Sequence, residues 1–198
     1  MPTANMVPID SHALATLRYI RKSMDAATSV AVPGSSGIAM GCVGLAATAV
    51  SHIPRLQEHW IAIWLLAAVI AAGLGGVLLA RPSSLRGLAP LSRHFRKFAL
   101  CMLPSLFAGA VLTGVLWYSG LRHALPGMWL LLYGCGLMAV SIVTASMIAT
   151  MGGLFVALGL LAFLVPETYQ IFLLGLGFGG LHIIFGILIG RTTHERQA

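Results

Sequence analysis

The sequence predicts an all-α polytopic membrane protein, built as a bundle of six transmembrane helices. Hydrophobic residues make up 58% of the chain and charged residues only 9%, whereas ordinary soluble domains carry about 25% charge. Apolar runs of about 20 residues, the length a helix needs to cross a bilayer, fill almost everything after Gly37. These runs cover about residues 37–53, 59–80, 98–119, 127–145, 147–165 and 171–190.

The remaining sequence divides into a leading segment, residues 1–34, and a tail, residues 191–198, on either side of a transmembrane domain at 35–190. Within the leading segment, residues 11–29 keep the spacing of an amphipathic helix, which suits a cytoplasmic or interfacial position. Its apolar face holds Leu14, Leu17, Met24 and Thr28, and its polar face holds Arg18, Arg21, Lys22 and Asp25.

Basic residues are shared unevenly between the two sides of the predicted bundle. Because basic residues stay on the cytoplasmic side, this asymmetry predicts that both termini are cytoplasmic. The formal net charge of +7 then favours anionic lipid headgroups on the cytoplasmic face as a partner. Nucleic acid is disfavoured because no aromatic residues are interleaved to stack on bases, and a homo-oligomer is compatible with the sequence. The cytoplasmic side would hold Arg18, Arg21, Lys22, Arg81, Arg86, Arg93, Arg96, Lys97, Arg191 and Arg196, and the outer side Arg55 and Arg122.

Prolines and cysteines refine the predicted bundle. The connection 81–97 is rich in proline and glycine and is predicted to be irregular. Three prolines are predicted near helix ends, where they are tolerated, which argues against broken ion-binding helices. Three cysteines fall inside the spans without a C-x-x-C spacing and are predicted to be reduced packing residues. These residues are Pro104, Pro126, Pro166, Cys42, Cys101 and Cys135.

A stripe of small residues marks the sixth span. Gly175, Gly179, His182, Gly186 and Gly190 share one face of an ideal helix. Glycines at this spacing let helix backbones approach closely in lipid. We therefore expect the stripe, His182 included, to face another helix. Gly37 with Gly41 and Ala72 with Gly76 are predicted to be further packing pairs.

His182 is the main candidate for a functional residue, because a histidine near the middle of a membrane needs a partner. One interpretation is a buried histidine hydrogen-bonded to a backbone carbonyl or to the hydroxyl of Tyr133 or Thr113. The other is contact with a ligand along a seam lined by His182, Tyr133 and the stripe glycines, or catalysis. An ion-coupled pump is disfavoured because every carboxylate lies outside the spans. These are Asp10, Asp25, Glu58, Glu167 and Glu195.

A metal site at the outer face is a weaker candidate. Histidine and carboxylate side chains suit zinc or copper, and five of them are predicted to gather there on short connections. No motif predicts a bound cofactor. The five are His52, Glu58, His59, His123 and Glu167.

Two family resemblances bear on function. Gly34-Ser35-Ser36-Gly37 has the form G-x-S-G, and His182 precedes Gly186 and Gly190, which resembles the rhomboid intramembrane proteases and implies a dyad of Ser36 and His182. In that family the serine belongs to the fourth span, whereas Ser36 opens the first. His182 is also eight residues from Gly190, so it lies ~12 Å deeper in the membrane than Ser36.

A second resemblance covers most of the chain and is carried by four segments. It is to a family of bacterial six-span membrane proteins whose activity is uncharacterised, and it implies a bacterial inner-membrane location. The segments run from Arg18 to Met24, from Val32 to Gly41, from Pro126 to Gly134 and from Gly179 to His182.

The leading functional hypothesis is a non-enzymatic membrane protein that binds or passes a small apolar or lipid-like molecule, or acts as a membrane sensor or assembly factor. The competing hypotheses are an intramembrane hydrolase that uses His182 and a metal-binding protein of the outer face.

Overall fold

The computed structural model describes residues 14, 16–17, 33–80, 90–142, 144 and 146–195. Their regular elements are all helical and form six stretches long and apolar enough to cross a membrane. This confirms the predicted fold class and indicates a multi-pass membrane protein. The elements are α2 (Gly34–Ser51), η1 (Gln57–His59), α3 (Trp60–Ala80), α4 (Pro90–Tyr118), η2 (Arg122–Ala124), α5 (Leu125–Ser141), α6 (Ser146–Leu164), α7 (Glu167–Leu174), the π-helix η3 (Gly175–Leu181) and α8 (His182–Glu195).

Only part of the predicted leading helix, and only part of the predicted connection after α3, belongs to the described residues. Leu14, Thr16 and Leu17 are helical, and the rest of the predicted helix at 11–29 lies outside the described residues. In the second connection, residues 81–89 also lie outside them, but residues 90–97 already belong to α4. The prediction of an irregular chain was therefore wrong for residues 90–97. Pro90 explains the early start, because the fixed φ angle of proline suits the first position of a helix.

The longer α4 also changes the place of one proline. Pro104 lies inside the helix, so the prediction that it sits near an end was wrong. Its ring is on an exposed side of the helix and removes a single backbone donor, which a transmembrane helix tolerates. Pro126 in the first turn of α5 and Pro166 directly before α7 lie near helix ends, as predicted.

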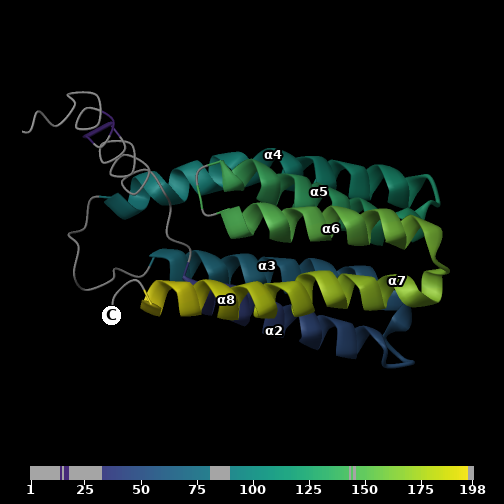
Figure 1. Ribbon diagram of the computed structural model, residues 1–198. Coiled ribbons are helices and arrows are strands. Elements are labelled where there is room, and N and C mark those ends of the chain that lie inside the picture. The colour runs from purple at the N-terminus through teal and green to yellow at the C-terminus, as the bar shows by residue number, and fades with distance from the viewer. Residues whose placement is uncertain are drawn as a thin grey trace, which may run out of the picture.

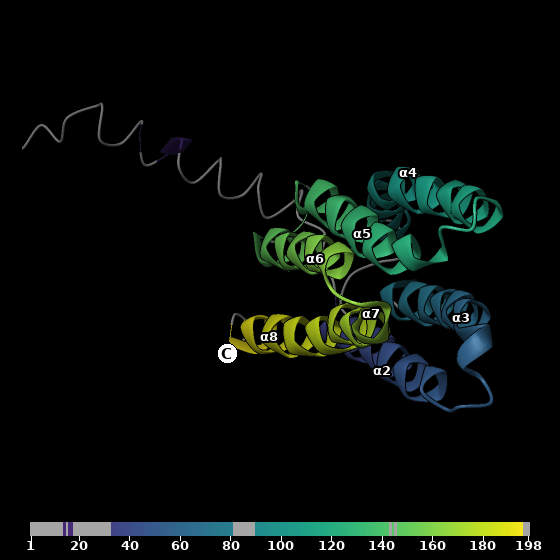
Figure 2. The same cartoon turned by 90° about the vertical axis from the view of Figure 1, so that its right-hand side faces the viewer.

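The helices form two groups of three. Helix α5 lies between α4 and α6, and α2 lies between α3 and the sixth span, which comprises α7, η3 and α8. Figure 1 shows α4, α5 and α6 above and α2, α3, α7 and α8 below, and Figure 2 shows the same division after a quarter turn. We call the end where α2 begins and α8 ends the terminal end, and the end where α7 begins the far end.

Burial is concentrated on α5. About 56% of its span is buried inside the protein, against 6% for the α3 span. Phe155, Leu130 and Val140 are fully buried and anchor an apolar core that also includes Leu173 and Leu174 from α7. The two groups of helices therefore meet where α5 and α6 face the sixth span.

Glycines set the closest helix contacts. A Cβ atom added to Gly41 would lie 2.8 Å from the carbonyl oxygen of Gly179, and one added to Gly134 would lie 2.7 Å from that of Gly152. Backbones thus touch between α2 and the sixth span and between α5 and α6, as small residues in a membrane allow. The predicted packing of Gly37 and Gly41 is confirmed.

The predicted packing role fails for three other residues. Gly76 has no neighbouring atom within 4 Å of an added Cβ, because this face of α3 points away from the bundle. All three cysteines are free, as predicted, but Cys42 and Cys135 are exposed rather than packed. Their small side chains lie on the outer surface of α2 and α5, on the sides turned away from the glycine contacts.

Candidate functional site

His182 begins α8 directly after the π-helix and is buried, with 4% of its surface exposed. Its Nε2 atom lies 2.8 Å from the hydroxyl oxygen of Tyr133 on α5. The expectation that the imidazole pairs with a hydroxyl of another helix is therefore confirmed for Tyr133. Thr113, the other hydroxyl considered, instead accepts a hydrogen bond from the Trp129 indole at 3.0 Å.

The second imidazole nitrogen, Nδ1, is buried and has no hydrogen-bond partner. Which member of the Tyr133–His182 pair donates depends on the imidazole tautomer. The hydrogen bond therefore satisfies the Tyr133 hydroxyl and Nε2 and leaves Nδ1 unpaired.

An aromatic cluster surrounds this pair and joins the two groups of helices. The Phe178 ring is stacked on the imidazole with centroids 6.2 Å apart, and the Phe155 ring meets the imidazole edge-on at 5.5 Å. Tyr133 lies 4.9 Å from Phe178, and Trp64 of α3 lies 5.9 Å from Phe178. Rings fill the space that a ligand at His182 would need.

The π-helix explains why His182 faces this cluster. Gly175 meets Thr48 of α2 and Gly179 meets Leu45, while Gly177 faces Leu130 and Phe155 on the other side. Gly186 again packs on α2, against Gly34 and Ile38. The prediction that His182 points with the stripe glycines was wrong. A π-turn holds more residues than an α-turn, so the ideal helical register does not hold across 175–181, and the imidazole turns toward α5 and α6.

Ser36 and His182 do not form the dyad that the rhomboid resemblance implies. The Ser36 hydroxyl is buried and donates to the carbonyl of Pro33 at 2.7 Å. His182 is bonded to Tyr133 instead. A nucleophilic serine requires its base within hydrogen-bond reach.

The five metal candidates belong to the far end of the bundle, as expected, but are not clustered. His52 closes α2, its Nδ1 is 2.8 Å from the carbonyl oxygen of Thr48, and Glu167 begins α7. Among the described residues, no three histidine, cysteine or acidic side chains come close enough to hold one metal ion. His52, Glu58 and His59 belong to the connection between α2 and α3, whereas His123 belongs to the connection between α4 and α5 and Glu167 to the start of α7.

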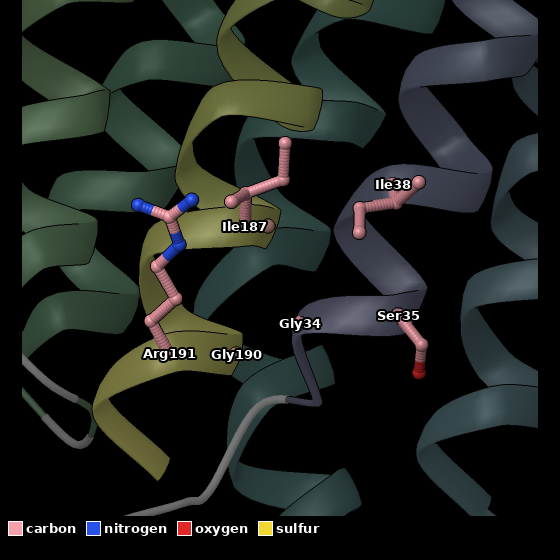
Figure 3. A pocket seen from close by; sticks show the side chains of 7 residues that line it. Gly34, Ser35, Ile38, Ile187, Gly190 and Arg191 are labelled. Carbon is pink, nitrogen blue, oxygen red and sulfur yellow. The ribbon is translucent and has the colours of Figure 1, made fainter. Parts of the chain in front are cut away.

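Sequence reasoning missed an open groove between α2 and α8 at the terminal end. Its volume is about 480 Å³, and it is lined by Gly34, Ser35 and Ile38 of α2 and by Gly186, Ile187, Gly190 and Arg191 of α8. Figure 3 shows Ile38 and Ile187 flanking the gap, Arg191 extended beside Ile187, and Ser35 turned away. Glycines at both helix ends were the available signal.

The groove forms because the glycines that line it have no side chains to fill the space between the two helices. Gly34 lies against the backbone of Gly186 and Gly190, so the two helices touch there. An added Cβ on Gly190 would meet no atom within 4 Å, so the space beside that residue is open. A smaller hollow of about 290 Å³ lies between α6 and the sixth span and is wholly apolar, lined by Leu154, Ala157, Leu158, Leu161, Leu176 and Leu181.

Comparisons with protein-family models, with curated proteins and with solved structures found no match to this chain.

Proposed function

We propose that the protein is a non-enzymatic membrane protein that binds a lipid-like molecule in the groove between α2 and α8. The observation that carries this proposal is the open apolar gap beside Gly190, about 480 Å³ in volume. That volume falls within the range of small-molecule sites, about 300–1,000 Å³. Isoleucine side chains and glycine backbone offer a chain-shaped ligand close contact along two helices.

The leading hypothesis allowed either binding or passage of a small molecule, and binding is the better supported of the two. A route along the predicted seam would have to pass Gly175 and Gly179, but Thr48 and Leu45 fill the space beside these glycines. His182 and Tyr133 are enclosed by aromatic rings. A bound lipid at the terminal end suits a membrane sensor or assembly factor, because it changes the surface that two helices present there.

The proposed setting is the inner membrane of a bacterium, with both termini in the cytoplasm. The resemblance to bacterial six-span proteins supports the location, and the uneven sharing of basic residues supports the orientation. The groove then lies at the inner edge of the bilayer, where the first residue of α2 and the last turns of α8 meet the headgroup region.

The test is to fill the groove without disturbing the fold. Gly190→Leu would place a side chain in open space inside the groove. Gly153→Leu on α6 is the matched control, because Gly153 is also open to a Cβ but lies outside the groove. Native mass spectrometry of the purified proteins should show a several-fold loss of bound lipid for Gly190→Leu only. Equal lipid content in both variants and the unmodified protein would refute the proposal.

A further inference from the structure

The net charge of the described residues belongs to one end of the bundle. At the terminal end, α4 and α8 carry four basic residues and one acidic residue, Glu195, whereas the far-end connections hold two of each. The net positive charge of the described residues is therefore at the terminal end, where the groove lies. Such an end attracts anionic headgroups with ~1 kcal/mol per nearby basic side chain.

Arg191 brings this charge to the groove itself. It is exposed and is the charged member of the groove lining. In Figure 3 its side chain runs back beside Ile187, with the guanidinium level with that residue. An arginine stem can lie on an apolar surface while its guanidinium turns toward the polar layer. A guanidinium at the mouth of the groove can form two parallel hydrogen bonds to a phosphate.

The start of α2 adds to the same field. Pro33 occupies the N-cap, makes no side-chain capping hydrogen bond, and no acidic residue lies in the first turn. Within α2, no side chain therefore compensates the positive end of the helix dipole at Gly34. Glu58 and Glu167 belong to the opposite end of the bundle.

We propose that the ligand of the groove is an anionic phospholipid, held with its phosphate at Arg191 and one acyl chain between Ile38 and Ile187. This inference rests on the proposed function and specifies the headgroup chemistry. An uncharged lipid would fill the apolar gap equally well but would leave the guanidinium without an acceptor.

The experiment compares two lipids with identical acyl chains, phosphatidylglycerol and the uncharged, phosphate-free diacylglycerol, titrated onto the protein in detergent. Native mass spectrometry gives the fraction bound. The unmodified protein should prefer phosphatidylglycerol, and Arg191→Gln should weaken that preference by about fivefold, the equivalent of ~1 kcal/mol. Arg96→Gln is the matched control, because it removes the same charge from α4, which does not line the groove.

The outcomes separate the two proposals. A loss of preference in Arg191→Gln but not in Arg96→Gln supports a headgroup site at the groove. Equal losses in both variants, or none in either, would overturn the headgroup inference and leave the groove in place. Binding of both lipids that is unaffected by Gly190→Leu would overturn the groove itself. Gel filtration and circular dichroism should show that each variant keeps its fold.

Discussion

Tyr133 and His182 form a buried polar pair whose members satisfy each other across the interface between the two groups of helices. The 2.8 Å hydrogen bond satisfies the Tyr133 hydroxyl and Nε2 of His182, whereas Nδ1 is buried without a partner. A polar pair inside an apolar cluster fixes how two helices meet, because any other register leaves both groups unpaired.

Tyr133→Phe should therefore destabilise the protein without changing its lipid binding. Hydrogen bonds between membrane helices contribute ~0.6–1.7 kcal/mol, and the imidazole would also keep a buried, unpaired nitrogen. We expect a loss of about 1–2 kcal/mol in the free energy of unfolding in detergent. Tyr169→Phe on α7 is the control, because that side chain is 59% exposed.

Tyr133→Phe together with His182→Leu provides a direct check of the pairing. If the pair is structural, the double variant loses less stability than the two single variants combined. Additive losses would show that the two side chains do not depend on each other.

At the scale of elements, the sixth span is divided by its π-helix into segments that serve different neighbours. Gly175 and Gly179 pack on α2, while Gly177 and His182 face α5 and α6. Close backbone contact on one side and ring packing on the other occur within two helical turns. The wide turn makes this possible, since it shifts the angular position of each following residue.

Gly44→Ala tests how strictly α2 and the π-helix are packed. An added Cβ at Gly44 would lie 2.7 Å from the carbonyl oxygen of Phe178, and a backbone atom cannot move aside as a side chain can. Overpacking of this kind costs ~1–3 kcal/mol, measurable as a lower midpoint of thermal unfolding. Gly73→Ala on α3, where an added Cβ meets nothing within 4 Å, should leave the midpoint unchanged or raise it. A similar effect of both substitutions would contradict the packing described.

The sequence alone predicted which segments are helical. It did not predict which face of each helix packs on a neighbour. Six apolar runs of spanning length predicted six spans. The need of a buried imidazole for a partner placed Tyr133 among the candidates, beside Thr113 and a backbone carbonyl. Residues 90–97 were misread because basic and polar residues at a membrane edge resemble a loop even when they continue a helix. The direction of His182 depended on a π-turn, which the residue spacing does not reveal. The groove depends on which glycines meet and which stay open, a property of three-dimensional contact.

At the scale of the whole molecule, charge and burial follow different divisions. Among the described residues, charge separates the two ends of the bundle. Burial instead separates α5 at the centre from α3 at the periphery, with 56% and 6% of their spans buried. The first division concerns orientation in the membrane, and the second concerns which helices neighbour lipid.

The proposed orientation is testable with reporter fusions. A fluorescent protein that folds only in the cytoplasm should be bright when fused after α8. Alkaline phosphatase, which is active only outside, should be active when inserted between Tyr118 and Arg122 at the far end. A dark fusion after α8 together with an inactive phosphatase insertion would refute the orientation. Expression levels of the fusions, measured by blotting, serve as the control.

The contact between α2 and the sixth span also has a consequence for biosynthesis. Helix α2 is the first of the six stretches to leave the ribosome, yet the nearest neighbours of Gly34, Gly41 and Gly44 belong to α8 and η3, the last to be made. Until the sixth span has been made, this face of α2 lacks its packing partner and must contact lipid or an insertase. The hairpin of α5 and α6, by contrast, closes on itself through Gly134 and Gly152 as soon as its second arm emerges. A chain that ends before residue 175 would therefore leave this face of α2 without its packing partner. Membrane proteases detect defects of this kind.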